Sequence, residues 1–253
     1  MKRTIALSLV AVLLLIQFAL SMNSSAYSQV EEFYINSAEG YVSIKMTLIS
    51  PGTFIMGSPK DEIGRKYMDS DQKQVTITRP FYLGIYEVTQ SQWKAIMGTN
   101  PTSYTFQSNW PVTSVSWDDC QEYIKRLNTM GIGTFRLPTE AEWEYACRAG
   151  STTRFPWGHD PTYGFLGEYA WYKESVGNWK CPHTVGKLKP NAWGLYDMHG
   201  NVWEWCEDYN SGSCPVRGGS WYNYPEFCRS ASRDTMTYWY KNDRVGFRLA
   251  RDL

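Results

Sequence analysis

We expect a single loop-rich α+β domain from the sequence, on three observations. Short runs of β-branched and aromatic residues occur in the first third of the chain, and amphipathic helical patterns follow them. From Ser151 onward, Gly, Pro, Asn, Trp and Tyr form short clusters with no sustained helical or strand period until the last residues. The 253 residues contain no internal repeat and no low-complexity linker, so one core is the natural expectation.

Four short apolar runs predict β-strands: Met46–Ile49, Phe54–Met56, Val75–Thr78 and Phe81–Ile85. Pro51-Gly52 separates the first two runs, and this dipeptide favours a type II turn because Gly supplies the positive φ. The first two runs are therefore predicted to pair as a hairpin. A charged loop over residues 60 to 73 separates that hairpin from the last two strands.

Three helices are predicted by their capping residues and spacing. Thr89 or Ser91 can cap a short helix that runs to Met97. The second helix follows Ser116, and its apolar residues repeat at i, i+3, i+4 and i+7: Cys120, Tyr123, Ile124 and Leu127. Thr139 and Glu142 form a capping-box pattern at the start of the third helix, Glu140 adds favourable charge there, and Gly150 closes it.

The charge balance argues against nucleic acid or anionic lipid as partners. The chain has 25 Lys and Arg residues and 25 Asp and Glu residues, giving a formal charge of zero. Its 12 Trp and 18 Tyr residues exceed what an ordinary aliphatic core requires, so many of these rings are expected to pack the loops together.

The N-terminus has the order of a secretory signal. Lys2 and Arg3 precede an apolar run over residues 5 to 20 and a small, polar stretch over residues 21 to 28. The run is shorter than the roughly 20 apolar residues that a spanning helix requires, which favours cleavage over an uncleaved anchor. No membrane attachment is expected beyond this segment. We predict a signal peptide over residues 1–28, a leader over 29–44 and the domain over 45–251, in a protein exported to the periplasm or secreted.

An even number of cysteines in an exported chain favours disulfides over metal ligation. They are Cys120, Cys147, Cys181, Cys206, Cys214 and Cys228. Six cysteines allow 15 pairings, and the spacing selects none of them. No two cysteines form a CxxC pair, and His159, His183 and His199 stand alone, so no zinc pattern is present in the sequence.

Seven phrases in fixed order resemble the formylglycine-generating enzyme, or sulfatase-modifying-factor, family over residues 45 to 251. They are Pro51–Ser58, Glu87–Thr89, Pro111–Trp117, Arg136–Ala146, Asn191–Trp205, Arg217–Trp221 and Gly246–Arg248. Each phrase is weak alone, but the ordered set is specific. The resemblance implies an irregular α+β fold related to C-type lectins.

Family members with the namesake activity look like copper oxidases that convert a sulfatase cysteine to formylglycine with two thiols placed shortly after a Gly-Gly-Ser phrase. Two soft thiolates suit Cu(I). Counted forward from that phrase, Asn223 takes the first thiol position here and Cys228 the second; counted back from the Arg-x-Ala-x-Arg phrase, Cys228 lies just outside the pair. Neither register leaves two thiols, and an amide oxygen is a hard ligand, so copper is not expected.

The resemblance also implies a calcium loop, with side-chain ligands from Asp197 and Glu204 and backbone carbonyls from Gly200 and Val202. Calcium prefers such hard oxygen ligands. The alternative is that Asp197 caps a turn and Glu204 is solvated or ion-paired. A second family calcium position is not assigned, because Trp171 stands where an oxygen donor is expected.

Ser220 and Arg233 match family positions that line a cleft for an extended substrate peptide, and Asn223, at the first thiol position, is the third cleft candidate. Alternatively, Ser220 satisfies a buried turn and Arg233 pairs with a core carboxylate. The resemblance also makes Cys147 one half of a structural disulfide. Ser230 stands where its partner is expected, so Cys228, two residues earlier, is the predicted replacement.

Two functions follow from these residues. In the first, the domain has kept the cleft, has lost the copper dithiol and binds a peptide, protein or glycan, with a sulfatase or another exported protein as its partner. In the second, it is an active formylglycine-generating oxidase that acts on exported sulfatases. Hydrolase chemistry is not indicated, because the chain contains neither a G-x-S-x-G nor an H-E-x-x-H motif.

Overall fold

The computed structural model describes residues 29–37, 40–105 and 107–253, so the predicted signal peptide lies outside the described residues. Three α-helices are described: α2 (Gln90–Met97), α3 (Trp117–Asn128) and α4 (Glu140–Arg148). The strands are β1 (Val30–Ser37), β2 (Gly40–Ile49), β3 (Gly52–Met56), β4 (Lys73–Ile77), β5 (Phe81–Gly84), β6 (Phe135–Arg136), β7 (Trp203–Trp205), β8 (Ser213–Arg217), β9 (Arg233–Thr237), β10 (Val245–Gly246) and β11 (Ala250–Asp252). Short 3-10 turns cover Leu166–Glu168 and Pro225–Phe227.

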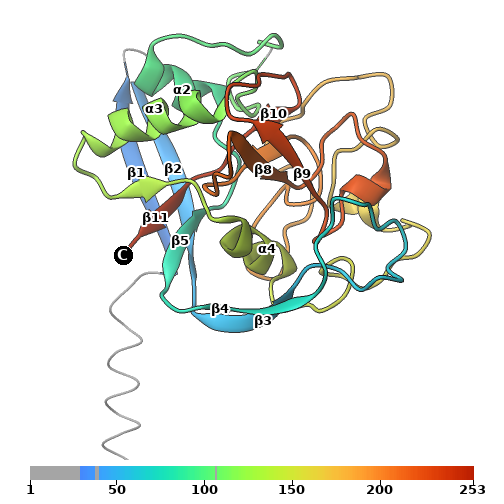
Figure 1. The fold of residues 1–253 in the computed structure, drawn as a ribbon. Helices are drawn as coiled ribbons and strands as arrows, with labels where there is room; N and C mark the ends of the chain where they lie inside the picture. Colours follow the sequence, from blue (N-terminus) through green and yellow to red (C-terminus); the bar gives the residue numbers. More distant parts are fainter. Residues whose placement is uncertain (1–28, 38–39, 106) are drawn as a thin grey trace, which may run out of the picture.

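The strands of the described residues form three sheets (Figure 1). The first has the order β1-β2-β5-β11-β6, the second β10-β7-β8-β9, and the third consists of β3 and β4. The last strand of the chain, β11, pairs antiparallel with both β5 and β6. The chain therefore returns at its end to the sheet that it began, which closes one α+β domain.

Residues 30–37 and 40–44, expected to form a leader ahead of the domain, lie in β1 and the first half of β2. The two strands pair antiparallel from Val30 opposite Thr47 to Ser37 opposite Gly40. Phe33 and Ile35 alternate with exposed residues, and the side chain of Ile35 is fully buried in the main core. This part of the chain belongs to the folded domain, because its alternating pattern supplies one apolar face.

The predicted hairpin across Pro51-Gly52 is wrong, although the strands exist. β2 pairs with β1 and β5, whereas β3 pairs with β4 across the charged loop. The dipeptide marks the point at which the chain leaves one sheet for another. Burial explains the choice of partners: the second half of β2 is mostly buried, while β3 is largely exposed before its last residue, Met56.

The three predicted helices are confirmed, each with a complete capping box. Thr89, Ser116 and Thr139 are the N-caps, and each side chain accepts a hydrogen bond from the residue three positions on, whose side chain accepts in return from the N-cap. α4 ends at Arg148, with Ala149 and Gly150 at φ 45° and 87°. Gly150 tolerates this left-handed backbone because it has no Cβ.

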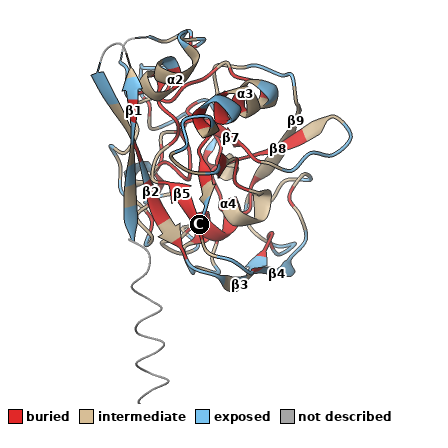
Figure 2. Ribbon diagram, turned by 90° about the vertical axis from the view of Figure 1, so that its left-hand side faces the viewer, coloured by how far each residue is buried: buried red, intermediate tan, exposed pale blue. Residues whose placement is uncertain are grey.

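The main core lies between the five-stranded sheet, α2, α3 and the four-stranded sheet. It is rich in rings: Trp93 stacks on Tyr123 with centroids 5.3 Å apart, and Phe247 meets both edge-on. Figure 2 shows buried residues in β5 and β8 and exposed residues along β1. In the second half of the chain, loops carry much of the buried surface, as expected. Within the described ranges, no helix is long and apolar enough to cross a bilayer.

Candidate functional site

A buried ion pair between Glu204 and Arg248 forms the centre of the candidate site. Glu204 lies on β7, Arg248 lies just before β11, and neither side chain is exposed. Nε and Nη2 of Arg248 donate to Oε2 and Oε1 of Glu204 at 2.6 and 2.7 Å. Nε1 of Trp143, on α4, donates to Oε2 at 2.7 Å. The alternative to calcium binding was that Glu204 is solvated or ion-paired, and the structure shows it ion-paired.

Arg248 also joins backbone segments that are far apart in the chain. Its Nη1 donates to the carbonyl of Gly84 at the end of β5, and its Nη2 to the carbonyl of Tyr196, both at 2.9 Å. Burial alone would lower the pKa of Arg248, but the charge of Glu204 and its hydrogen bonds raise it above the usual value. The guanidinium therefore stays charged and connects β5, β7, the loop at Tyr196 and the C-terminal segment.

Two more buried carboxylates, Glu87 and Asp197, surround this pair. Glu87 accepts from Nδ2 of Asn201 at 2.8 Å and from the Val202 N–H at 3.2 Å. Burial, followed by the charges of Asp197 and Glu204, raises the pKa of Glu87 well above its usual value. Burial likewise raises the pKa of Asp197 to about 6. Three carboxylates thus face one guanidinium, and the cluster favours protons or a cation.

Two side-chain oxygens of the predicted calcium set keep acceptor capacity, which is the chemistry that a hard cation requires. Oδ2 of Asp197 accepts from the Gly186 N–H at 2.7 Å, whereas its Oδ1 is buried and has no hydrogen-bond partner among the described residues. Oε1 of Glu204 accepts one hydrogen bond from Arg248, and an ionised carboxylate oxygen can accept two. No three His, Cys, Asp or Glu side chains in the described part of the chain are arranged as a metal cluster, but two members of this set are backbone carbonyls.

The backbone of the same loop is fixed at Gly200. A Cβ built on Gly200 would lie 2.4 Å from the carbonyl oxygen of Trp171, and the Asn201 N–H donates to that carbonyl at 2.8 Å. Only glycine permits this approach. The carbonyls of Gly200 and Val202 therefore belong to a loop held in one conformation.

Ser220 and Asn223, two of the three cleft candidates, contact each other in the turn that begins at the serine of the Gly-Gly-Ser phrase. Oδ1 of Asn223 accepts from Oγ of Ser220 at 2.6 Å and from Nε1 of Trp203 at 2.8 Å. Ser220 is fully buried, and its Oγ also accepts from the Tyr222 N–H at 3.4 Å. The side chain at the first expected thiol position is thus a hydrogen-bonded amide, and Ser220 does satisfy a buried turn.

Arg233 lies elsewhere, at the start of β9. Its Nε and Nη2 donate to the carboxylate of Glu140 at 2.6 and 3.2 Å, and Glu140 also pairs with Arg217 at 2.9 Å. Burial would raise the pKa of Glu140, but the two arginines lower it below its usual value. Arg233 therefore pairs with a carboxylate of α4, which was the structural alternative for this residue.

Cys228 is fully buried in an apolar cluster with Phe155, Leu166, Ala170 and Tyr172. Burial raises the pKa of its thiol far above the usual value, and the charge of Glu226 acts in the same direction. The single thiol after the Gly-Gly-Ser phrase is therefore protonated at neutral pH.

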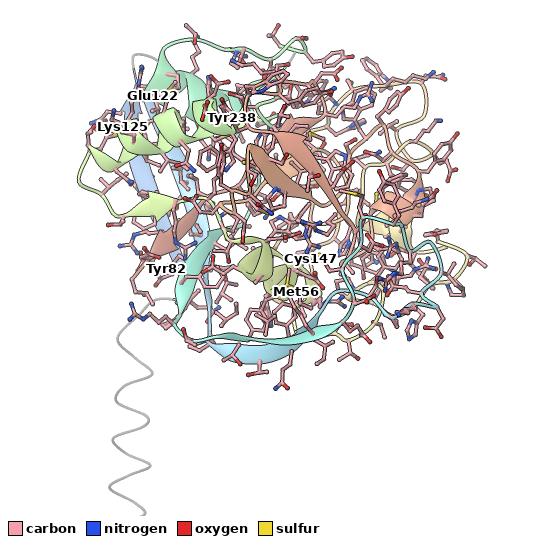
Figure 3. The ribbon with its side chains drawn as sticks, viewed as in Figure 1. Met56, Tyr82, Glu122, Lys125, Cys147 and Tyr238 are labelled. Carbon is pink, nitrogen blue, oxygen red and sulfur yellow. The ribbon has the colours of Figure 1, made fainter. Side chains whose placement is uncertain are left out.

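The expected bridge between Cys147 and Cys228 is not formed, because both are free thiols in the structure. Cys147 lies on α4 (Figure 3), and its Sγ is 3.6 Å from Nε2 of His199. Nδ1 of His199 is 2.8 Å from the Cys228 carbonyl, whereas Sγ of Cys228 faces Gly219, where an added Cβ would lie 3.0 Å away. The two sulfurs face different neighbours, with the imidazole of His199 bridging Cys147 and the backbone of Cys228. Burial raises the pKa of Cys147 to about 12 and lowers that of His199 to about 4, so this pair is neutral.

Two exposed tyrosines flank Asn223. Tyr222 and Tyr224 are 45% and 49% exposed. The guanidinium carbon of Arg244 lies 3.5 Å from the Tyr222 ring centroid, and Nζ of Lys173 lies 3.8 Å from that of Tyr224. Cation–π contacts of this kind favour these orientations of the two rings at the surface.

Glu87, Asn201 and Arg248 have no role predicted from the sequence, although each lies within one of the seven phrases. For Arg248 the sequence did carry a signal, because this charged residue stands between Phe247 and Leu249 in an apolar stretch. Such a residue needs a buried partner. Its partner is 44 positions away in the chain, so only the fold identifies it.

This arrangement is an irregular, loop-rich α+β fold of the sulfatase-modifying-factor type. Residues 37–253 match the family described as "Sulfatase-modifying factor enzyme 1-like domain". The chain belongs to that family.

Among its relatives, the chain is 33% identical over 190 residues to "Chaperone protein LppX" of Paenibacillus barcinonensis, and 32% identical over 206 residues to "Formylglycine-generating enzyme" of Streptomyces coelicolor. These matches cover 55% and 65% of the chain, and the chain spans 65% and 60% of the two relatives' own lengths. The solved structure of PvdO from Pseudomonas aeruginosa is 27% identical, with a TM-score of 0.78, and the match covers 90% of this chain and 100% of that one.

Removing the positive charge from the centre of the site is expected to destabilise the fold. Arg248→Met leaves Glu204 buried beside Glu87 and Asp197 without a countercharge, so we expect a loss of about 3–5 kcal/mol in the free energy of unfolding. Urea unfolding at pH 7, followed by tryptophan fluorescence, measures it. Arg126→Met is the control: it breaks an exposed pair with Glu122 and is expected to cost less than about 1 kcal/mol. Equal losses in the two variants would contradict this role of the ion pair.

The pKa of Asp197 predicts a pH-dependent stability. Because burial raises it from 3.8 to about 6, the native state holds this proton more tightly than the unfolded chain, and stability is lost as pH rises from about 4 to about 6. In calcium-free buffer, Asp197→Asn removes that loss, so its advantage over the wild type is expected to grow with pH to roughly 1–3 kcal/mol at pH 7. Urea unfolding across pH 4 to 7 tests the slope, with the exposed Asp61→Asn as the control. A difference that is constant or shrinks with pH would contradict the prediction.

Proposed function

We propose that this chain is an exported binding module of the sulfatase-modifying-factor family, which holds a peptide or protein segment at the surface around Asn223 without oxidising it. This proposal rests on Asn223, whose amide occupies the first expected thiol position and accepts hydrogen bonds from Ser220 and Trp203. The remaining thiol, Cys228, is buried and protonated.

This arrangement is unsuited to Cu(I). The ion prefers soft thiolate ligands, and ligation requires that the thiol lose its proton. Oδ1 of Asn223 is hard, neutral and already accepts two hydrogen bonds. Ionising Cys228 would place a negative charge among apolar side chains, where burial opposes it.

The surface beside Asn223 supports a binding role. Tyr222 and Tyr224 present large rings whose orientations their cation contacts favour, and rings oriented in advance lose less conformational entropy when a partner binds. One relative carries the name of a chaperone, which agrees with a protein partner. Export follows from the signal-like order of residues 1–28, and an exported sulfatase is one candidate partner.

A calcium ion is part of the same proposal. The unpartnered Oδ1 of Asp197, the acceptor site left on Glu204 and the carbonyls of Gly200 and Val202 would hold it. When bound, calcium supplies positive charge to a cluster of three carboxylates and one guanidinium. Side chains of this loop also fix the neighbouring backbone. Asp197 accepts a hydrogen bond from the Gly186 N–H, and the amide of Asn201 accepts from the His183 N–H and donates to the His183 carbonyl.

The absence of oxidase activity is tested with the purified protein, Cu(I) and a Cys-x-Pro-x-Arg peptide, using mass spectrometry to detect conversion of cysteine to the aldehyde. We expect no conversion and no stoichiometric Cu(I) in a competition assay with a chromogenic chelator. Conversion that is lost in Cys228→Ser would establish the oxidase instead, and conversion that survives in that variant would show that the thiol assignment is mistaken.

The binding role is tested by selecting displayed random peptides on the wild-type protein. Affinities of the selected peptides are expected to fall roughly tenfold in Tyr222→Ala and in Tyr224→Ala, because hot-spot aromatic residues contribute on that scale. Tyr41→Ala is the matched control, since Tyr41 is 77% exposed and lies on β2 in the five-stranded sheet. Unchanged affinity in both flanking variants would place the binding surface elsewhere.

Calcium is tested by thermal unfolding with CaCl2 or with a chelator. At 100 times its Kd, calcium is expected to stabilise the wild type by about 2.7 kcal/mol. Asp197→Asn should lose most of this response, because it replaces a carboxylate ligand with a neutral amide. An equal response in the wild type and the variant would exclude Asp197 as a ligand.

A further inference from the structure

A second concave site lies between the β3–β4 hairpin and the end of α4, where the ribbon of the hairpin runs beneath the helix (Figure 1). The cavity has a volume of about 440 Å³, within the size range of small-molecule sites. Its wall carries the rings of Phe54, Tyr145 and Trp193. It shares none of its lining residues with the surface around Asn223.

The aromatic wall is rigid. The centroids of Phe54 and Tyr145 are 5.2 Å apart, and those of Tyr145 and Trp193 are 4.9 Å apart. Asn191 fixes the loop of Trp193: its Nδ2 donates to the Ala146 carbonyl at 2.8 Å, and its Oδ1 accepts from the Trp193 N–H at 3.0 Å. The ring of Trp193 is thus anchored to the last turn of α4.

The cavity offers no free charge. Of the described residues that line it, Arg148 alone is charged, and all three of its guanidinium nitrogens are engaged. Nε donates to Glu144 at 2.8 Å, Nη1 to the Thr153 carbonyl at 3.0 Å and Nη2 to the Gly57 carbonyl at 2.9 Å. An ionised ligand would find no countercharge here, so the cavity selects a neutral one.

The rim is polar and uncharged. Thr53, Gln74 and Thr152 are exposed and line the cavity, offering two hydroxyl groups and one amide. Oγ of Thr53 shares one hydrogen bond with Thr76 at 2.9 Å and keeps further acceptor capacity. The rings of the wall are inclined to one another by 48° and 69°, so each offers its own apolar face. An apolar ring face with donors and acceptors at the edge of the cavity matches a ligand ring that has an apolar face and hydroxyl groups around it.

We propose that this cavity binds one ring of a neutral saccharide chain. The C–H face of the sugar packs on Trp193 and Phe54, and its hydroxyl groups bond with Gln74, Thr53 and Thr152. The site is independent of the peptide surface proposed around Asn223, so either can exist without the other.

The test uses the folded domain labelled at its indole N–H groups and titrated with cellohexaose and chitohexaose. We expect a saturable NMR shift of the Trp193 indole and an affinity that falls roughly fivefold in Phe54→Ala and in Gln74→Leu. Gln74 is exposed, so its replacement tests the rim without disturbing the core. Trp179→Ala is the control, because Trp179 is 69% exposed and does not line the cavity.

Three results would overturn the proposal. The first is no shift of the Trp193 indole at about 10 mM of either neutral saccharide. The second is binding that neither cavity variant weakens. The third is an equal or stronger Trp193 shift with an oligoproline peptide or with hexagalacturonate, which would assign the cavity to a peptide or to an anion.

Discussion

The fold of the C-terminal half depends on the buried ion pair of Glu204 and Arg248. Loops cover much of this half, so few regular ladders satisfy its backbone groups. Arg248 compensates by donating to the carbonyls of Gly84 and Tyr196 as well as to Glu204. Trp143 adds α4 to the same centre. One guanidinium therefore sets the relative positions of both main sheets, a helix and a long loop, at the cost of burying charge in a dry interior.

The carboxylates around that pair extend its influence to the surface. Asp197 holds the Gly186 N–H, and Asn201 links Glu87 to the backbone of His183. The His183 ring in turn stacks on Trp171 with centroids 4.0 Å apart. Aromatic rings outside the central core thus pack against loops, and buried polar groups hold those loops in place. A loop-rich domain obtains a defined shape in this way without long strands.

The region after the Gly-Gly-Ser phrase is organised by one amide and encloses one buried thiol. An amide at position 223 accepts hydrogen bonds from Ser220 and Trp203, which organises a turn. The remaining thiol of Cys228 lies in an apolar cluster, where burial keeps it protonated. Belonging to the family therefore fixes the fold more firmly than it fixes the reaction.

The sequence alone determined the three helices, the four strand segments that became β2 to β5, and the family, because capping boxes, local periodicity and ordered phrases involve residues that are close in the chain. It could not decide strand partners: β2 and β3 enter different sheets although only Ser50 and Pro51 separate them. Nor could it predict that Glu204 pairs with Arg248, that Arg233 pairs with Glu140, or that Cys147 faces His199. Those contacts join residues 44 to 93 positions apart. Burial selects them, and burial exists only after the chain has folded.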